Sequence, residues 1–210
     1  MQLIDLSLEL KDRSLSYPGT SSGVGLEQLD MGFPGCQVSR FSRFDPHCGT
    51  HFDAPLHFVP QAKDVSTAPL MLPEVVVIST CDDPIPADVL NSHGSLEGKA
   101  ILFSTGWEQH AGTSAFFEGF PSLTPALAEQ LVAQKVALVG LDSPSVDAAS
   151  GDYPVHRMLL SAGIPILEGL INLHFLPSHM EAGSRVRLAA FPLRIRGLEG
   201  SPVRAVAIVE

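Results

Sequence analysis

Short apolar runs separated by turn signals constrain the fold of this chain more than any other feature. The runs are rich in Val, Ile and Leu, and six of them stand out: Val75–Ser79, Ala100–Phe103, Val136–Leu141, Ile164–Leu167, Val186–Leu193 and Val203–Val209. Segments of this length and composition are typical of strands that are buried in a sheet. The sequence therefore predicts a sheet-rich core.

Two further strands are expected nearer the N-terminus. Apolar and polar side chains alternate in residues 4–10, and a period of two is typical of a strand with one buried face. Val38–Phe44 resembles another strand and leads directly into a histidine-rich segment. Between them we expect a turn at Tyr17-Pro18-Gly19 and a Gly- and Ser-rich loop over residues 20–36.

Helical signals are fewer. Thr124 followed by proline is typical of a helix start, and the apolar spacing continues to about Gln134. A second short helix is predicted over Pro154–Ala162, with Gly163 ending it. Strands outnumber helices and the two types intermix, without a linker or repeat. We therefore expect an α/β (mixed α+β) fold, in which residues 1–210 form one compact domain with a mixed sheet.

Composition narrows the possible partners. The net charge of −10 argues against nucleic acid and anionic membranes as general partners, and no apolar stretch approaches the roughly 18 residues of a membrane span. The N-terminus lacks the pattern of a signal peptide. The three cysteines, Cys36, Cys48 and Cys81, are few and odd in number, which argues against a disulfide framework, so a cytoplasmic location is expected. The mean hydropathy of +0.21 fits either a large monomer core or apolar surface covered by a second subunit.

The segment HCGTHFDAPLH, His47–His57, carries the chemistry. Imidazole nitrogen and carboxylate oxygen are the ligands expected for zinc, manganese or iron(II) in hydrolytic sites. Asp53 follows His51 by two positions, so in an extended segment both side chains lie on one face. Pro55 fixes the chain just before His57. We therefore predict a metal site here.

Further ligands are expected from elsewhere in the chain. The best candidates are His156, near the start of the second predicted helix, and Glu168, at the end of an apolar strand. A buried carboxylate needs a partner, which a metal or a salt bridge would supply equally well. Trp107 either lines a pocket or packs, and Cys48 is not expected to bind metal. Four histidines are expected in loops or at the surface: His93, His110, His174 and His179.

These residues resemble the HxGTHxDxPxH signature of the cyclase-like metal hydrolase family, which includes bacterial kynurenine formamidase (arylformamidase) and isatin hydrolase. The resemblance extends along most of the chain. Other segments similar to the family are Tyr17-Pro18-Gly19, Ser104-Thr105-Gly106-Trp107, Gly140–Asp147, Leu167-Glu168-Gly169 and Ser201–Ala205.

The resemblance implies roles for seven residues. His47, His51 and Asp53 would bind one divalent metal, Zn²⁺ or Mn²⁺. Glu168 would join that site and, with Asp53, would bridge to a second ion held by His156. His57 would be the catalytic acid–base group. Tyr17 would contact the substrate where kynurenine formamidases typically have tryptophan. The family fold is a swivelling β/β/α domain, and members usually form dimers or tetramers.

The function predicted from the sequence is hydrolysis of a non-peptide amide by metal-activated water, with an aryl formamide such as N-formylkynurenine as substrate. One alternative is a related hydrolase that opens a cyclic amide such as isatin. Another is a metal-dependent cyclase or dehydratase that uses His57 as a base. A third is a non-catalytic metal-binding module, although a structural site is normally closed and would not need a further histidine.

Overall fold

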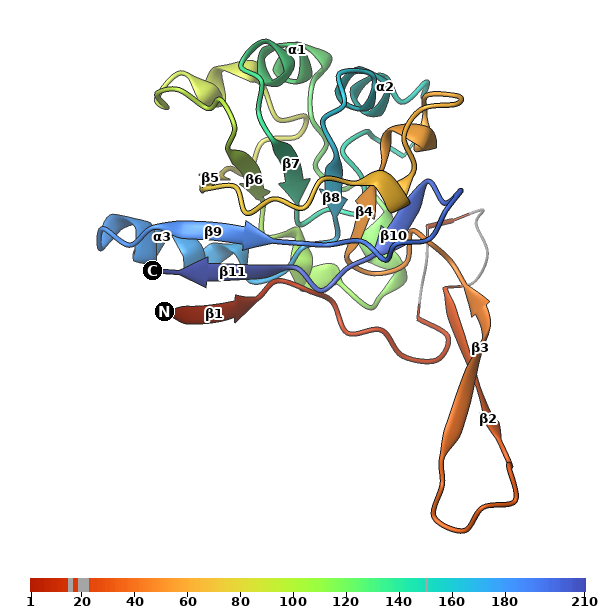
Figure 1. The fold of residues 1–210 in the computed structure, drawn as a ribbon. Coiled ribbons are helices and arrows are strands. Elements are labelled where there is room, and N and C mark those ends of the chain that lie inside the picture. The colour runs from red at the N-terminus through yellow and green to blue at the C-terminus, as the bar shows by residue number, and fades with distance from the viewer. Residues whose placement is uncertain (15–16, 19–22, 150) are drawn as a thin grey trace.

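The computed structural model describes residues 1–14, 17–18, 23–149 and 151–210 of the chain. Three layers make up the body of the molecule (Figure 1). Helices α1 and α2 cover one face of a six-stranded mixed sheet, and a three-stranded antiparallel sheet covers the other face. This β/β/α layering confirms the predicted mixed α/β domain.

The six-stranded sheet holds most of the predicted apolar strands. In spatial order it contains β10 (Gly200–Pro202), β4 (His51–Asp53), β8 (Ile166–Glu168), β7 (Leu138–Leu141), β6 (Ala100–Ser104) and β5 (Val75–Ser79). Strands β5 to β8 are parallel, whereas β4 and β10 run antiparallel to their neighbours. The two antiparallel strands lie at the end of the sheet where the histidine-rich segment joins it.

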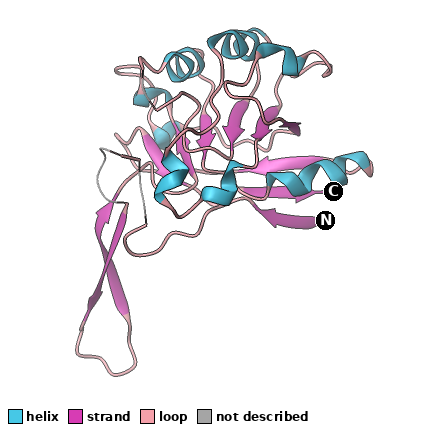
Figure 2. Cartoon of the chain, turned by 180° about the vertical axis from the view of Figure 1, so that it is seen from behind, coloured by secondary structure: helices cyan, strands magenta, loops and turns pink. Residues whose placement is uncertain are grey.

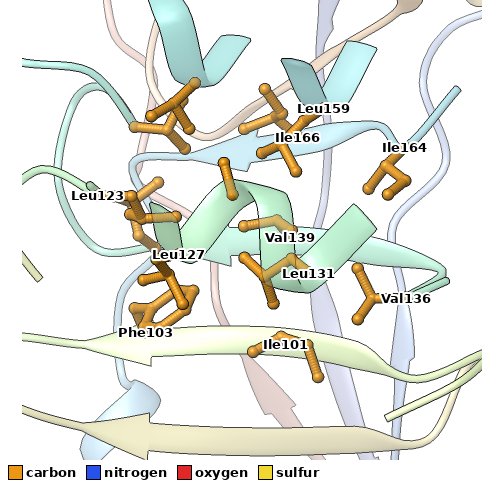
Figure 3. Close-up of a cluster of buried hydrophobic side chains, with 14 of the residues drawn as sticks. Ile101, Phe103, Leu123, Leu127, Leu131, Val136, Val139, Leu159, Ile164 and Ile166 are labelled. Atoms are coloured by element: carbon orange, nitrogen blue, oxygen red, sulfur yellow. The ribbon is translucent and has the colours of Figure 1, made fainter. Parts of the chain in front are cut away.

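Both predicted helices are present. Helix α1 spans Pro125–Ala133, and the Thr124 side chain accepts a hydrogen bond from the backbone N–H of Leu127, as an N-cap does. Helix α2 spans Pro154–Ser161, and Gly163 follows it with a positive φ of 76°. Their apolar faces pack on β6, β7 and β8, and Figure 3 shows this core. Its labelled side chains are Ile101, Phe103, Leu123, Leu127, Leu131, Val136, Val139, Leu159, Ile164 and Ile166.

The second sheet contains β1 (Gln2–Asp5), β11 (Val206–Val209) and β9 (Val186–Ala189). Together with α3 (Leu176–Glu181) it encloses a second apolar core against the other face of the large sheet. The strand predicted over residues 4–10 is shorter than expected. After β1 the chain crosses toward the large sheet, where Ser7 makes an isolated bridge with Leu170.

A long hairpin extends away from the layered body (Figures 1 and 2). It pairs β2 (Val24–Leu29) with β3 (Val38–Phe44) in antiparallel register. The predicted strand at Val38–Phe44 is therefore confirmed, but the loop predicted over residues 20–36 is wrong where β2 forms. Gly19 and residues 20–22 of the predicted turn and loop lie outside the described residues.

Short 3-10 turns complete the fold: Pro55–His57 (η1), Val65–Thr67 (η2), Ala87–Leu90 (η3), Trp107–His110 (η4), Ser114–Phe117 (η5) and Leu173–Phe175 (η6). In the described part of the chain, every helix is too short or too polar to cross a bilayer.

Candidate metal centre

Strand pairing brings the central ligand candidates together. His51 and Asp53 lie on β4, and the register of β4 with β8 places His51 directly opposite Glu168. His156 reaches the same place from the first turn of α2. His47 precedes β4 on a turn in which its backbone N–H donates to the Asp45 carboxylate.

The five predicted ligands form one cluster. Around Asp53, its Oδ1 lies 2.8 Å from His47 Nδ1 and 3.6 Å from His51 Nε2, and its Oδ2 lies 3.6 Å from His156 Nε2. Glu168 closes the cluster, with Oε2 3.3 Å from His51 Nε2 and Oε1 3.2 Å from His156 Nε2. Three imidazoles thus face two carboxylates.

Burial of two carboxylates favours a cation in this cluster. Asp53 is 0% exposed, and the groups that face its oxygens are the imidazoles of His47, His51 and His156. Glu168 is also buried. Unpaired buried carboxylates are costly, and histidine with carboxylate is a ligand set suited to zinc or manganese. His47, His51 and Asp53 each offer a ligand atom, and these atoms lie within 4.8 Å of one another. The residues present therefore fit a divalent metal.

Protons take the place of a cation in the metal-free protein. Burial by itself would lower the pKa of His47, but the carboxylates of Asp53, Glu199 and Glu168 together outweigh burial and raise that pKa to about 10. Burial likewise opposes the charged form of His156, yet the carboxylates of Glu168, Asp147 and Asp53 together hold its pKa well above the usual value. Burial would raise the pKa of Asp53, whereas the neighbouring His47 charge keeps it well below the usual value. The cluster therefore attracts positive charge strongly.

His57 stands beside the cluster on the turn Pro55–His57. Its ring lies 4.3 Å from the ring of His47 and 5.8 Å from that of His156, centroid to centroid. Burial is the main cause that lowers the pKa of His57 below its ordinary value. A neutral imidazole that adjoins the cluster can accept a proton near neutral pH.

Asp147 is a site residue that sequence reasoning did not single out. Its carboxylate accepts hydrogen bonds from the backbone N–H groups of Val155 and His156, and its Oδ2 lies 2.7 Å from His156 Nδ1. It thereby caps α2 and turns His156 Nε2 toward Asp53 and Glu168. The available signal was its place at the end of the family-like block Gly140–Asp147.

A cavity of about 540 Å³ opens above the cluster. His47, His51, His57, His156 and Glu168 contribute to its lining. Most of the remaining wall is apolar or aromatic, and it includes Leu8, Leu10, Phe58, Phe116, Phe117 and Tyr153. An aromatic ring against the apolar wall, with a polar group that reaches the floor, would match this cavity, and the charged residues Glu9, Lys11 and Arg13 also line it.

Tyr17 also lines this cavity, as the resemblance implied for a residue near the substrate. Its ring meets the ring of Phe117 edge-on at 5.9 Å, and burial raises its pKa to about 12. Trp107 is absent from the lining. Its indole N–H donates to the Phe116 carbonyl, so Trp107 packs behind the wall.

The four remaining histidines lie apart from the cluster. Within the described residues, His93, His110, His174 and His179 belong to none of the groups able to hold a metal. Cys48 is buried, and burial raises the pKa of its thiol to about 11, which favours the protonated form that binds metals poorly. A residue that the sequence did not flag, Glu199, places its Oε1 3.4 Å from His47 Nε2. The hydrogen bond from His47 is the main cause that lowers the pKa of Glu199.

Comparison with known proteins gives consistent matches. The Cyclase family model matches residues 4–148. The chain is 36% identical over 209 residues to a kynurenine formamidase of Geobacillus thermodenitrificans, covering 96% of this chain and 95% of the relative. It is 34% identical over 218 residues to a kynurenine formamidase of Salinibacter ruber, covering 98% of this chain and 97% of the relative.

Solved structures agree in fold. Isatin hydrolase A from Labrenzia aggregata superposes with a TM-score of 0.82 at 26% identity, covering 98% of this chain and 93% of that one. An isatin hydrolase bound to the product analogue thioisatinate gives a TM-score of 0.85 at 24% identity, covering 100% of this chain and 93% of that one. The family match spans more than half of the chain, and the relatives cover nearly all of it. This chain therefore belongs to the Cyclase family.

Proposed function

We propose that this protein is a metal-dependent hydrolase that cleaves a non-peptide amide, with an aryl formamide such as N-formylkynurenine as the favoured substrate. The observation that carries the proposal is the buried cluster of imidazoles and carboxylates at the floor of an apolar cavity, with His57 beside it. The kynurenine formamidases to which the chain is 30–36% identical support the substrate class.

The proposed ligands are His47, His51, Asp53, His156 and Glu168. They would hold one or two ions of Zn²⁺ or Mn²⁺. Both carboxylates approach His156 as well as the histidines of the HCGTHFDAPLH segment, so they could bridge two ions. We assign the whole of residues 1–210 to one hydrolase domain.

The proposed reaction is the attack of water on the amide carbonyl. A bound divalent metal lowers the pKa of water from about 15.7 to about 7 and polarises a carbonyl oxygen. His57, neutral in the resting site, accepts a proton and delivers it to the departing nitrogen. Phe116 and Phe117 line the cavity, where they would contact an aryl ring and keep bulk water away.

An aryl amine is a better leaving group than an alkyl amine, which fits this simple acid–base arrangement. The same site would open a strained cyclic amide. Similarity to isatin hydrolase A at a TM-score of 0.82 favours this second candidate. The two candidate functions differ only in which substrate the cavity wall accepts. The relative turnover of an aryl formamide and a cyclic amide therefore decides between them.

We further propose that the protein forms a homo-oligomer. The hairpin β2–β3 leaves large apolar side chains exposed away from the body, with Phe33 68% and Phe41 63% exposed. An isolated two-stranded hairpin is marginally stable in water, so a second copy of the chain is the proposed cover. We also propose a cytoplasmic location, which its free cysteines Cys36, Cys48 and Cys81 support.

The test is product analysis in ¹⁸O-labelled water with the metal-loaded protein. N-formylkynurenine, N-formylaniline and isatin would be offered separately. A hydrolase places one solvent oxygen in the acid product. Turnover without label in the product indicates a cyclase or dehydratase instead. Metal binding without any turnover across the panel indicates a non-catalytic metal-binding module.

A further inference from the structure

In two imidazoles of the cluster, Nδ1 forms a hydrogen bond with an acceptor that is not one of the five proposed ligands. His51 Nδ1 lies 3.0 Å from the carbonyl oxygen of Gly49, and His156 Nδ1 lies 2.7 Å from Asp147 Oδ2. A carbonyl or a carboxylate can only accept, so each Nδ1 carries the proton. The Nε2 atom of each ring is then left to face the carboxylates of the cluster.

His47 has the opposite arrangement. Its Nε2 faces outward, 3.4 Å from Glu199 Oε1, and its Nδ1 faces inward, 2.8 Å from Asp53 Oδ1. Glu199 lies one residue before Gly200, and Gly200 pairs with Asp53 in the register of β10 and β4. The two carboxylates therefore approach opposite nitrogens of one ring.

The packing leaves His47 few alternative orientations. Its ring lies so close to Gly200 that a Cβ there would come within 2.5 Å of His47 Cε1. The ring also meets those of His57 and His51, whose centroids are 4.3 Å and 5.1 Å away. The backbone carbonyl of Glu199 accepts a hydrogen bond from the Ala54 N–H at 2.8 Å, so the Glu199 side chain starts from a fixed point.

We propose that Glu199 is a positioning residue that holds His47 so that Nδ1, rather than Nε2, binds the metal. The proposal rests on the proposed function in one respect, which is that His47 is a ligand. A carboxylate that accepts the outer N–H of a ligand histidine fixes the orientation of the ring and makes the inner nitrogen a stronger donor. Asp147 accepts the outer N–H of His156 in this way, and Glu199 accepts that of His47 from the solvent side.

The exposure of the two carboxylates differs. The Glu199 side chain is 36% exposed, whereas that of Asp147 is 6% exposed. Asp147 also caps α2, so its removal would disturb the fold. Within the part of the chain that the structure describes, Glu199 accepts no hydrogen bond from a helix N–H, and its side chain can be changed with less risk to folding.

The test measures the Zn²⁺ affinity of the whole protein by competition with a chromophoric chelator. Glu199→Ala removes the acceptor and should weaken Zn²⁺ binding about tenfold or more, the usual effect of losing such a partner. Glu199→Gln keeps an amide oxygen that can accept the Nε2 proton, so most of the wild-type affinity should remain. Glu129→Ala removes an equal charge from the exposed face of α1 and should change nothing.

A second readout identifies the binding nitrogen. In zinc-loaded wild-type protein with ¹⁵N-labelled histidine, NMR should show His47 bound through Nδ1 and protonated at Nε2. Binding through Nε2 would overturn the inference, as would a Glu199→Ala affinity equal to wild type. If Glu199→Gln lost as much affinity as Glu199→Ala, charge rather than positioning would be the cause, and the inference would fail. A wild-type protein that takes up no Zn²⁺ would overturn the proposed metal site itself.

Discussion

At the scale of single residues, two buried carboxylates determine the chemistry of the site. Asp53 and Glu168 face three imidazoles and no lysine or arginine among the described residues. In the metal-free protein His47 and His156 are protonated and balance this charge, because the carboxylates raise the pKa values of both imidazoles. Protons and metal ions compete for the same nitrogens.

This competition predicts a pH dependence of metal binding. The pKa of His47 is raised to about 10. In the metal-free protein below that pH, the imidazole therefore carries a second ring proton and a positive charge. Binding must release this proton, and affinity should rise about tenfold per pH unit for each proton released between pH 7 and 9. Calorimetry in buffers of different ionisation enthalpy measures the release. An affinity that stays flat over this range would contradict the prediction.

His57 should contribute to turnover but not to metal binding. His57→Ala removes the group that moves the proton, and the expected loss of kcat is about 10²- to 10⁴-fold, as for other acid–base groups. Elemental analysis should find the same metal content as in the wild type. Loss of metal from this variant would instead identify His57 as a ligand.

The local sequence predicted part of this arrangement. The spacing of His47, His51 and Asp53 suffices to bring them together, because they belong to one short segment. Asp147 lies nine residues before His156, and its place at the end of the block Gly140–Asp147 was a usable signal. The contact of Glu199 with His47 joins residues 152 positions apart, so it depends on tertiary structure and no local pattern encodes it.

At the scale of elements, the site depends on the antiparallel end of the large sheet. Strand β4 pairs with β8 on one side and β10 on the other, so it lies between Glu168 and Gly200. The sequence did not predict β4 or β10, because each has only three residues and β4 consists of His, Phe and Asp, which show no apolar run. The long apolar strands were predicted because burial on both faces selects Val, Ile and Leu.

Strand β2 was missed for a different reason. It lies in a hairpin outside the body, so no buried face imposes an alternating pattern on most of its residues. Its Glu27, Gln28 and Gly25 are typical of loops. Pairing with β3, rather than burial, makes this segment a strand.

Gly200 provides a test of how β10 supports the site. Gly200→Ala would place a Cβ 2.5 Å from His47 Cε1 and should displace that ring, which weakens metal binding while the fold remains intact. Gly94→Ala is the matched control, because no atom lies within 4 Å of its new Cβ. Metal affinity and far-ultraviolet circular dichroism measure the two effects. Equal metal affinity of the two variants would show that contact with Gly200 does not hold His47.

At the scale of the whole molecule, the layered body and the projecting hairpin differ in how they are stabilised. The body has two apolar cores, one on each face of the large sheet. The hairpin contributes to neither core and exposes Leu26, Met31, Phe33 and Phe41. Its conformation is therefore expected to depend on a second copy of the chain.

Replacing the two exposed phenylalanines of the hairpin tests this dependence. Phe33→Ser with Phe41→Ser should shift the protein from dimer or tetramer to monomer in sedimentation velocity, because apolar cover from the partner is lost. Phe175→Ser, a substitution of another half-exposed phenylalanine on the body, should leave the assembly unchanged. A wild-type protein that is monomeric at micromolar concentration would rule out the proposed assembly.

The most direct test of the central claim is a metal titration of turnover. Protein stripped with a chelator would receive Zn²⁺ or Mn²⁺ in steps, and the rate of N-formylkynurenine hydrolysis would be followed at each step. Turnover should be absent at first and should rise until the site formed by His47, His51, Asp53, His156 and Glu168 is filled. Full turnover by the stripped protein, or none after metal is bound, would contradict metal-dependent amide hydrolysis at this site.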